Sequence, residues 1–343
     1  MFRNIYGLDL GTYEIKVFDK KRDFIWKERN IIAKKDQKFL YAAGDEAWDM
    51  FEKAPENIEV LFPMQGGAIA KFDDMQCLLQ ELLKKERPFY GGSEYLVAVP
   101  TDVTEVEKRA FYDLVCYSAA RARTVRIAER AIVDAIGFGV NVNRTDGIFI
   151  VNMGGGSTEI SVLSRGGMVM NRLMKLGGEH LDQAIQDQVR HHLEFLIGRR
   201  TAEMLRQDFG IFEDATCTAI NVSGRNLRTR VPEYREIPVG MVRAAMREPL
   251  KECVSEIRAM FDRTPPTVRS GLQKNGICLT GGLANLKELS TYLEESTGLA
   301  VRTVSRPELC VVEGLKKIIQ DKRAYKEWTY SLLDGEYKWL RKL

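Results

Sequence analysis

The chain has 343 residues, more than a single hydrophobic core usually supports, so two domains are expected. Hydrophobic residues make up 45% and charged residues 29% of the sequence, which is typical of a globular protein and excludes a disordered tail. The formal net charge of +3 is too small to indicate nucleic acid as a partner, although a local basic patch can still contact an anionic surface.

The cysteines and histidines do not predict a metal site. Six cysteines are widely spaced without a CxxC pair, and two of only three histidines are adjacent, at His191 and His192. We interpret the cysteines as buried, reduced thiols. No segment approaches the roughly 18 consecutive apolar residues of a membrane span, and the N-terminus reaches a polar turn too early for a signal peptide. These features predict a cytoplasmic protein.

Apolar segments rich in β-forming residues alternate with longer segments of helical periodicity, which predicts the α/β class. In chain order, strands are expected at residues 5–8, 15–18, 95–99, 148–151, 159–163 and 276–279. A helix is expected over 101–122, where Thr104 and Glu107 have the spacing of a capping box. Two more helices are expected at 181–196 and 241–261, the second ending before Thr264-Pro265-Pro266.

A weak internal repeat indicates a duplicated domain. A predicted strand followed by Asp9-Leu10-Gly11-Thr12 recurs as a strand followed by Asn152-Met153-Gly154-Gly155, with an offset of 143 residues (152 − 9 and 154 − 11). Each turn precedes another predicted strand. Two halves that each open on a strand, a turn and a strand suggest a ligand between them.

Three glycine turns, at 11–13, 154–157 and 281–284, can present backbone N–H groups to an anion such as a phosphate. The hydroxyls of Thr12, Ser157 and Thr158 can add hydrogen bonds, and Lys16 can supply a charge to β- and γ-phosphates. A single glycine turn is more often a plain hairpin, but three adjacent glycines at 154–156 weaken a strand end unless the space is needed. The turns match neither a dinucleotide fingerprint nor a P-loop, because they lead into strands and lack Gly-Lys-Ser/Thr.

Seven ordered segments resemble the MreB family of bacterial actin-like proteins, within the actin, Hsp70 and sugar-kinase ATPase superfamily. They are GLDLGT (7–12), FPMQGGAIAKFDDM (62–75), VAVPTDVTEVEKRA (97–110), VNMGGGSTEISVLSRGG (151–167), IGRRTAEMLR (197–206), PPTVRSGLQKNGICLTGGLANLKEL (265–289) and PELCVVEGLKKI (307–318). Together they cover about residues 5–320.

The resemblance implies an α/β actin-like ATPase fold with two ribonuclease-H-like domains around a nucleotide cleft, each with a small inserted subdomain. Domain I would comprise residues 1–145 plus about 315–343, and domain II residues 146–314, with 321–343 extending beyond the family match. The implied function is an ATP-binding protein that polymerises into filaments controlling cell shape and cell-wall synthesis. Its implied partners are itself, MreB-family paralogues, the cell-wall elongation machinery and the inner face of the cell membrane.

The resemblance also assigns site residues. Asp9 would hold Mg²⁺ through water, as a hard oxygen ligand beside a triphosphate. Glu203 and Arg206, one helical turn apart, would reach the ribose and base; without the family they would be an ordinary surface pair. The residues expected to surround the phosphates are Gly11, Thr12, Tyr13, Lys16, Gly154, Gly155, Gly156 and Ser157. Those expected to back the adenine are Gly281, Gly282, Leu283 and Ala284.

Two positions depart from the family's chemistry. Asn152 stands where the family has an aspartate that helps to hold hydrated magnesium, and Arg130 stands where a glutamate positions the attacking water. The neighbouring Glu129 should point elsewhere, because adjacent helical residues do not share a face. A guanidinium cannot accept a hydrogen bond from water, so we expect ATP hydrolysis to be weak or absent. Alternatively, Arg130 neutralises phosphate and favours retained nucleotide.

These departures define the competing functions. The alternative to an active filament protein is a degenerate, non-hydrolysing scaffold or copolymer partner. Tyr13 and Leu283 are bulkier than the family residues and are expected to narrow the pocket. A small-molecule kinase is disfavoured, because no substrate-binding insertion is evident.

Two segments bear on membrane binding. The loop at 84–95 carries Phe89 and Tyr90 where the family inserts apolar side chains into lipid; an exposed hairpin is the alternative. In the 321–343 extension, apolar residues fall near helical spacing at Tyr325, Trp328 and Leu332. This extension is either an interfacial anchor, a helix for a partner, or a segment that docks on its own domain.

Overall fold

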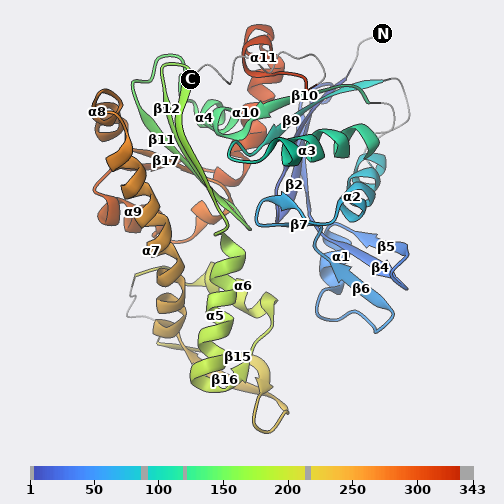
Figure 1. The fold of residues 1–343 in the computed structure, drawn as a ribbon. Helices are drawn as coiled ribbons and strands as arrows, with labels where there is room; N and C mark the ends of the chain where they lie inside the picture. Colours follow the sequence, from blue (N-terminus) through green and yellow to red (C-terminus); the bar gives the residue numbers. More distant parts are fainter. Residues whose placement is uncertain (1–3, 86–91, 119–121, 213–217, 333–343) are drawn as a thin grey trace.

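The computed structural model describes residues 4–85, 92–118, 122–212 and 218–332 (Figure 1). Its first five-stranded sheet has the order β10-β9-β1-β2-β3. The strands are β1 (Ile5–Leu10), β2 (Glu14–Asp19), β3 (Phe24–Arg29), β9 (Ser93–Val99) and β10 (Ala122–Glu129). β1, β2 and β3 pair antiparallel, whereas β1, β9 and β10 pair parallel. β1 and β9 are central and buried almost throughout, which explains their nearly continuous apolar sequences.

The second five-stranded sheet repeats this plan with the order β13-β12-β11-β17-β18. Its strands are β11 (Ile148–Met153), β12 (Thr158–Ser164), β13 (Gly167–Met174), β17 (Ile277–Thr280) and β18 (Val301–Thr303). Here too three strands pair antiparallel and two more continue the sheet in parallel. β11 begins 143 residues after β1 (148 − 5), the offset of the sequence repeat.

Two helices, α4 (Arg130–Phe138) and α10 (Cys310–Gln320), pack against each other between the sheets. A Cβ placed on Gly137 would lie 1.9 Å from the carbonyl oxygen of Cys310, and one on Gly314 would lie 1.9 Å from that of Val133. The helices therefore touch backbone to backbone, which only glycine allows. Side chains of both sheets join them in one buried cluster, so this crossing connects the two halves.

Each half carries a small insert. The first contains β4 (Ile32–Lys35), β5 (Phe39–Ala43), α1 (Asp45–Met50) and β6 (Ile58–Leu61), with a hairpin of β7 (Met64–Gln65) and β8 (Ala68–Ile69) leading back. The second contains β14 (Phe195–Leu196), β15 (Ala219–Asn226) and β16 (Pro232–Pro238). The two inserts lie on the same side of the sheets, below them in Figure 1.

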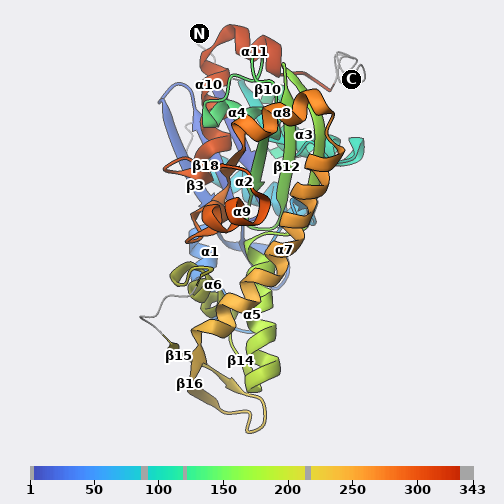
Figure 2. The same ribbon diagram turned by 90° about the vertical axis from the view of Figure 1, so that its left-hand side faces the viewer.

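The remaining helices lie around the sheets and beside the second insert (Figure 2). They are α2 (Phe72–Lys85), α3 (Glu105–Ser118), α5 (Gly178–Leu193), α6 (Arg199–Asp208), α7 (Val239–Arg263), α8 (Pro266–Asn275), α9 (Leu289–Thr297), α11 (Lys322–Trp328) and the 3₁₀ turns η1 (Gly282–Asn285) and η2 (Pro307–Leu309). The capping box of α3 is confirmed, because the amides of Thr104 and Glu107 each donate to the other's side chain. α5 begins and ends three residues before its predicted bounds, because Glu194 leaves the helix with a φ of 49°.

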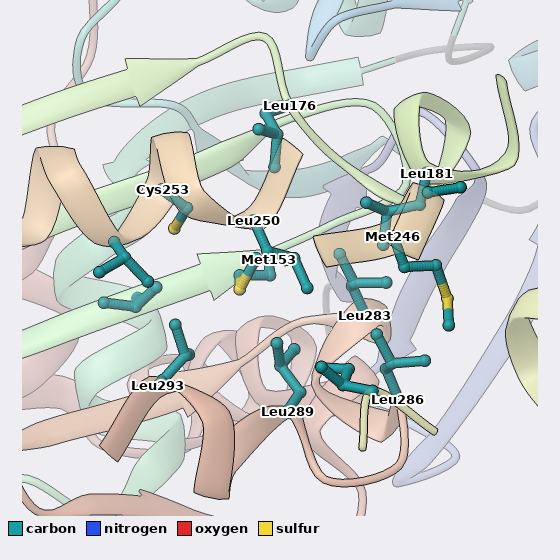
Figure 3. Close-up of a cluster of buried hydrophobic side chains, with 14 of the residues drawn as sticks. Met153, Leu176, Leu181, Met246, Leu250, Cys253, Leu283, Leu286, Leu289 and Leu293 are labelled. Carbon is teal, nitrogen blue, oxygen red and sulfur yellow. The ribbon is translucent and has the colours of Figure 1, made fainter. Parts of the chain in front are cut away.

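A large apolar core lies beneath the second sheet. Figure 3 shows Met153, at the end of β11, meeting Leu250 and Cys253 of α7, with Leu283 of η1 and Leu289 of α9 close by. This core supports two of the three glycine turns, since one turn directly follows Met153 and the other contains Leu283.

The chain beyond α11 docks on the first sheet. Tyr330 exchanges two backbone hydrogen bonds with Ile127 of β10, of 2.8 and 3.0 Å, and Arg126 donates to the carbonyl oxygen of Thr329 at 2.7 Å. Leu332 packs against the buried cluster of this half, whereas Tyr325 and Trp328 join the cluster at the α4–α10 crossing, which both sheets share. For residues 321–332, docking on the own domain is therefore confirmed; residues 333–343 lie outside the described residues.

In the described part of the chain, no helix is both long and apolar enough to cross a membrane. Cys77, Cys116, Cys253, Cys278 and Cys310 are free thiols. Cys77 and Cys116 are only half-buried, whereas we expected all of them to be buried. Cys217 lies outside the described residues.

Candidate functional site

The three glycine turns line one cavity of about 380 Å³ between the two halves. Its lining includes Asp9, Gly11, Thr12, Tyr13, Lys16, Arg130, Asn152, Gly154, Gly155, Gly156, Ser157, Glu203, Arg206, Gly281, Gly282 and Leu283. Val311 also lines it, so segments up to 302 residues apart in the sequence (311 − 9) converge on one space. Such a cavity, with backbone amides and a few charged side chains, suits a polar, anionic ligand.

The first two turns are closed in the same way. The amide of Gly11 donates to the carbonyl oxygen of Glu14 at 3.1 Å, and that of Gly154 donates to the carbonyl oxygen of Ser157 at 2.8 Å. Each turn joins the first two strands of its sheet. The repeat therefore extends to the hydrogen bonds of the turns.

The two turns also face each other closely. A Cβ on Gly155 would lie 2.7 Å from Cβ of Tyr13, and one on Gly156 would lie 2.7 Å from Cγ2 of Thr12. The Thr12 hydroxyl accepts a hydrogen bond of 3.1 Å from the amide of Gly67 in the β7–β8 hairpin. Close approach of the two halves, rather than positive φ, therefore requires glycine at 155 and 156.

Asn152, at the end of β11, is oriented by an aspartate that the sequence reasoning missed. Its side-chain nitrogen donates to Asp134 Oδ2 at 2.8 Å, and the Thr280 hydroxyl donates to the same oxygen. Asp134 is fully buried on α4, and burial raises its pKa to about 6. The available signal was a lone acid within the apolar helical segment AIVDAIG. The amide at 152 therefore has a local role, because it stabilises a buried carboxylate.

We expect Asp134 to make stability fall between about pH 4 and pH 7. Its folded-state pKa of about 6 lies above the ordinary value of 3.8, so the folded protein binds the proton more tightly. The stabilising proton is fully bound below pH 3.8 and is lost as the pH rises through 6. The contribution amounts to about 3 kcal/mol. Urea denaturation at several pH values should show that Asp134→Asn removes this fall in the free energy of unfolding. The variant Asp146→Asn, at an exposed position, should retain it. The same pH dependence in both variants would contradict the assignment.

Asp9 and Lys16 lie opposite each other in the β1–β2 register, with Oδ2 and Nζ 4.0 Å apart. Both are buried and line the cavity. Two oxygen ligands for a hydrated magnesium ion line the cavity, the Asp9 carboxylate and the side-chain amide oxygen of Asn152. The Asn152 oxygen lies beside the third turn, since a Cβ on Gly281 would lie 2.8 Å from it. No group of three or more carboxylates, histidines or cysteines that could hold a metal occurs in the described residues. These residues fit a cation held through water and attached weakly.

Arg130 is the first residue of α4 and lines the cavity, although only 7% of the residue is exposed. Among the described residues, its Nε and one terminal nitrogen have no hydrogen-bond partner. The guanidinium therefore faces the phosphate turns without a protein acceptor at these atoms.

Glu129 turns to the other side of the chain, as predicted. It accepts hydrogen bonds from Lys108 Nζ at 3.2 Å and from the Tyr330 hydroxyl at 2.7 Å. Burial raises the pKa of this carboxyl, against the lowering effect of Lys108. Glu129 thus secures the C-terminal segment and does not replace the missing carboxylate at 130.

A contact across the cavity joins the two halves. The Tyr13 hydroxyl donates to Glu203, and burial together with this carboxylate raises the Tyr13 pKa well above its usual range. Arg29 lies over the Tyr13 ring at 4.5 Å and over the Trp48 ring at 4.1 Å, and its Nη1 is 4.0 Å from Glu203. A hydroxyl that stays protonated and a stacked cation therefore hold Glu203 between the halves.

We expect Tyr13→Phe to lower the free energy of unfolding by about 1–3 kcal/mol, the contribution of one hydrogen bond to a charged acceptor. The ring that contacts Arg29 is retained, so the loss reports the hydroxyl. Tyr117→Phe is the matched control, since 65% of Tyr117 is exposed. Equal stabilities of the two variants in urea denaturation would show that the contact contributes nothing.

Glu203 and Arg206 are not a surface pair. Glu203 is buried and also accepts from Gln207 Nε2 at 3.0 Å. Arg206 is bound to Asp182 of α5, with Nε donating to Oδ1 at 2.6 Å. Both line the cavity, but protein partners engage their charged groups.

The third turn supplies the remaining wall. Gly281 adopts a φ of 84°, and a Cβ there would lie 2.4 Å from the carbonyl oxygen of Met153. Gly282 and Leu283 also line the cavity. Ala284 is not among the described lining residues, and it packs against the apolar core of the second half.

A family model described as MreB/Mbl protein matches residues 3–327. The chain belongs to the MreB/Mbl family. It is 33% identical over 329 residues to the cell shape-determining protein MreB of Escherichia coli K12, covering 93% of this chain and 94% of that protein. It is 29% identical over 318 residues to Mbl of Bacillus subtilis 168, covering 92% and 95% of the two chains.

Solved structures agree with this family membership. MreB 5 of Spiroplasma citri bound to AMPPNP superposes with a TM-score of 0.88 at 26% identity, covering 95% of this chain and 98% of that one. The MamK double helical filament gives a TM-score of 0.78 at 18% identity, covering 93% and 99%, which shows the fold alone. The predicted actin-like fold, with two sheet cores around a cleft, is confirmed.

Within this MreB/Mbl protein, the residues predicted for the phosphates surround one cavity, whereas the membrane residues Phe89 and Tyr90 lie outside the described residues. Sequence reasoning missed Arg29 as well as Asp134. Arg29 ends a strand whose pattern gives no signal for a stacking role, so only its contacts with Tyr13 and Trp48 identify it.

Proposed function

We propose that this MreB/Mbl protein binds ATP in the cavity between its two halves. One observation carries the proposal: two hydrogen-bonded glycine turns face each other, with Lys16 and Arg130 beside them. The structures of Spiroplasma citri MreB5 are bound to AMPPNP and to ADP, which supports a nucleotide in this chain too. The test is the nucleotide released from purified, denatured protein, together with titration by ATP and GTP. Failure to retain or bind either nucleotide would refute the proposal.

The proposed roles follow the position of each residue. The amides of residues 11–13 and 154–156 hold the phosphates, and Lys16 adds charge. Asp9 contacts hydrated magnesium when it is present, and the ion adds further charge neutralisation at the phosphates. Gly281, Gly282 and Leu283 back the adenine. Glu203 and Arg206 reach the ribose, which requires Glu203 to exchange the Tyr13 hydroxyl for a sugar hydroxyl.

We also propose slow ATP turnover, because no carboxylate stands at position 130 to orient a water molecule. Phosphate release by the wild type should be below that of an Arg130→Glu/Asn152→Asp/Asp134→Asn variant, in which the carboxylates return to the cleft. The Asp134 change keeps two carboxylates from meeting in the buried wall. A wild type that is as fast as the variant would contradict slow turnover.

The assembly proposed for this protein is a filament at the cytoplasmic face of the cell membrane that controls cell shape. The whole-chain match to cell shape-determining relatives supports this and favours it over a degenerate scaffold or copolymer partner. We further propose that domain I comprises residues 1–145 plus about 315–343 and domain II residues 146–314. Paralogues and the cell-wall elongation machinery are the proposed partners.

Sedimentation and electron microscopy with ATP, with and without anionic liposomes, test polymerisation and membrane attachment together. Filaments that form but do not bind liposomes would contradict only the proposed membrane attachment, which depends on Phe89, Tyr90 and residues 333–343. Absence of filaments over a range of magnesium and salt concentrations would contradict the assembly.

A further inference from the structure

The Arg130 side chain is a buried cation with unused hydrogen-bond donors. It is 93% buried (7% exposed), yet Nε and one terminal nitrogen have no partner among the described residues. A buried charge that lacks acceptors is strongly destabilising, and an unsatisfied donor adds to that cost. Such a group is tolerable where a ligand or water completes its hydrogen bonds.

The carboxylates around Arg130 are largely engaged elsewhere. Asp134 accepts from Asn152 and Thr280, and Glu129 accepts from Lys108 and Tyr330. Asp9 lies 4.0 Å from Lys16 Nζ. Asp134 Oδ1 and Glu129 Oε2 also lack a hydrogen-bond partner among the described residues, yet neither carboxylate forms a hydrogen bond with Arg130 Nε.

Glu159 is the carboxylate that competes for this role. It lines the same cavity, where its Oε1 accepts from the amide of Thr101 at 3.0 Å and its Oε2 has no partner in the part of the chain that the structure describes. Since Arg130 Nε also remains unpartnered, the two groups share the cavity without a direct bond. Each group therefore keeps hydrogen-bonding capacity for a water molecule or a ligand in the cavity.

Helix α4 places Arg130 in the cavity that the second glycine turn also lines. Arg130 and Asp134 lie four residues apart and therefore on one face of the helix. Asp134 is hydrogen-bonded to Asn152, two residues before the glycines at 154–156. This contact fixes α4 against the end of β11, so that the helix N-terminus and the Arg130 charge lie beside the turn.

We propose that Arg130 binds the terminal phosphate of a nucleoside triphosphate and takes over the charge neutralisation that a divalent cation usually provides. The triphosphate then binds with little dependence on magnesium. The charges agree with this assignment: arginine in place of glutamate and asparagine in place of aspartate both make the phosphate end of the cleft more positive. They also leave Asp9 and one amide oxygen as weak attachments for magnesium. The inference rests on the proposed nucleotide site.

The experiment measures the affinities of ATP and ADP by calorimetric titration of the full-length protein, in millimolar magnesium and in EDTA. The variants are Arg130→Gln and Arg130→Lys, with Arg123→Gln as a matched control, since Arg123 is exposed on β10. Wild-type ATP affinity should change by less than about threefold on removal of magnesium. Arg130→Gln should weaken ATP at least about tenfold in EDTA, the loss of one charged hydrogen bond, with ADP nearly unaffected. Arg130→Lys should retain part of the affinity, and Arg123→Gln all of it.

Three results would overturn the inference. One is a loss of ATP affinity of more than about tenfold when magnesium is removed from the wild type. Another is ATP binding that Arg130→Gln leaves unchanged. The third is a nucleotide-free Arg130→Gln protein with a markedly lower melting temperature, which would show an ion pair with Glu159 as the structural role. A wild type that binds no nucleotide in either buffer refutes the proposed function itself, so the two failures are distinguishable.

Discussion

Replacing Gly314 with alanine is expected to lower the free energy of unfolding by at least about 3 kcal/mol. An alanine Cβ at this position would lie 1.9 Å from the carbonyl oxygen of Val133, which is backbone and cannot rotate away. The α4–α10 crossing would have to open, in a core packed as densely as an organic crystal. Because α4 carries Arg130 and Asp134, the cavity would be disturbed as well.

Gly137→Ala should have a similar effect, since its Cβ would meet the carbonyl oxygen of Cys310 at the same crossing. Gly240→Ala is the matched control, because Gly240 lies in a helix and no atom of the described residues is within 4 Å of a Cβ there. The control should raise the free energy of unfolding by at most about 1 kcal/mol. If chemical denaturation gives Gly314→Ala and Gly240→Ala the same free energy of unfolding, backbone contact between the two helices is refuted.

Asn152→Asp is expected to destabilise the protein by about 3 kcal/mol at pH 7, although the resemblance implies an aspartate at this position. The change removes the hydrogen bond to Asp134 and brings a second carboxylate to a group that is already fully buried. Two adjacent carboxyls share one proton, so the upper pKa of the pair rises in the folded state. The destabilisation by Asn152→Asp should therefore become smaller as the pH falls towards 5 and larger as the pH rises.

The exchange variant Asp134→Asn/Asn152→Asp separates charge repulsion from other causes. It keeps one acid and one amide in contact, with the donor and acceptor reversed, and should return stability at pH 7 to within about 1 kcal/mol of the wild type. Urea denaturation of both variants at pH 5 and pH 7 tests the pair. A double variant as unstable as Asn152→Asp alone would show that the amide at 152 serves something other than Asp134.

The strands and turns could be predicted because their signals are local. Buried strands have nearly continuous apolar residues, and adjacent glycines at 154–156 stand out in any sequence. The position of Glu203 could not be predicted in the same way. It bonds to Tyr13, 190 residues away, and no spacing rule connects the two. The lining of the site was largely anticipated, except that Ala284 is not among the described lining residues, because the contacts of a 3₁₀ turn depend on packing.

The sequence alone therefore determined the α/β class, the repeat and the chemistry of the turns, all of which depend on residue types a few positions apart. It also determined that Asn152 and Arg130 change the charge of the cleft. Only the tertiary structure decided what these two residues contact. Asn152 stabilises a buried aspartate on a helix from the other half, while the buried Arg130 has no acceptor for its Nε in the part of the chain that the structure describes. Those outcomes depend on the crossing of α4 and α10, where distant segments are brought together by packing, and no local pattern encodes that contact.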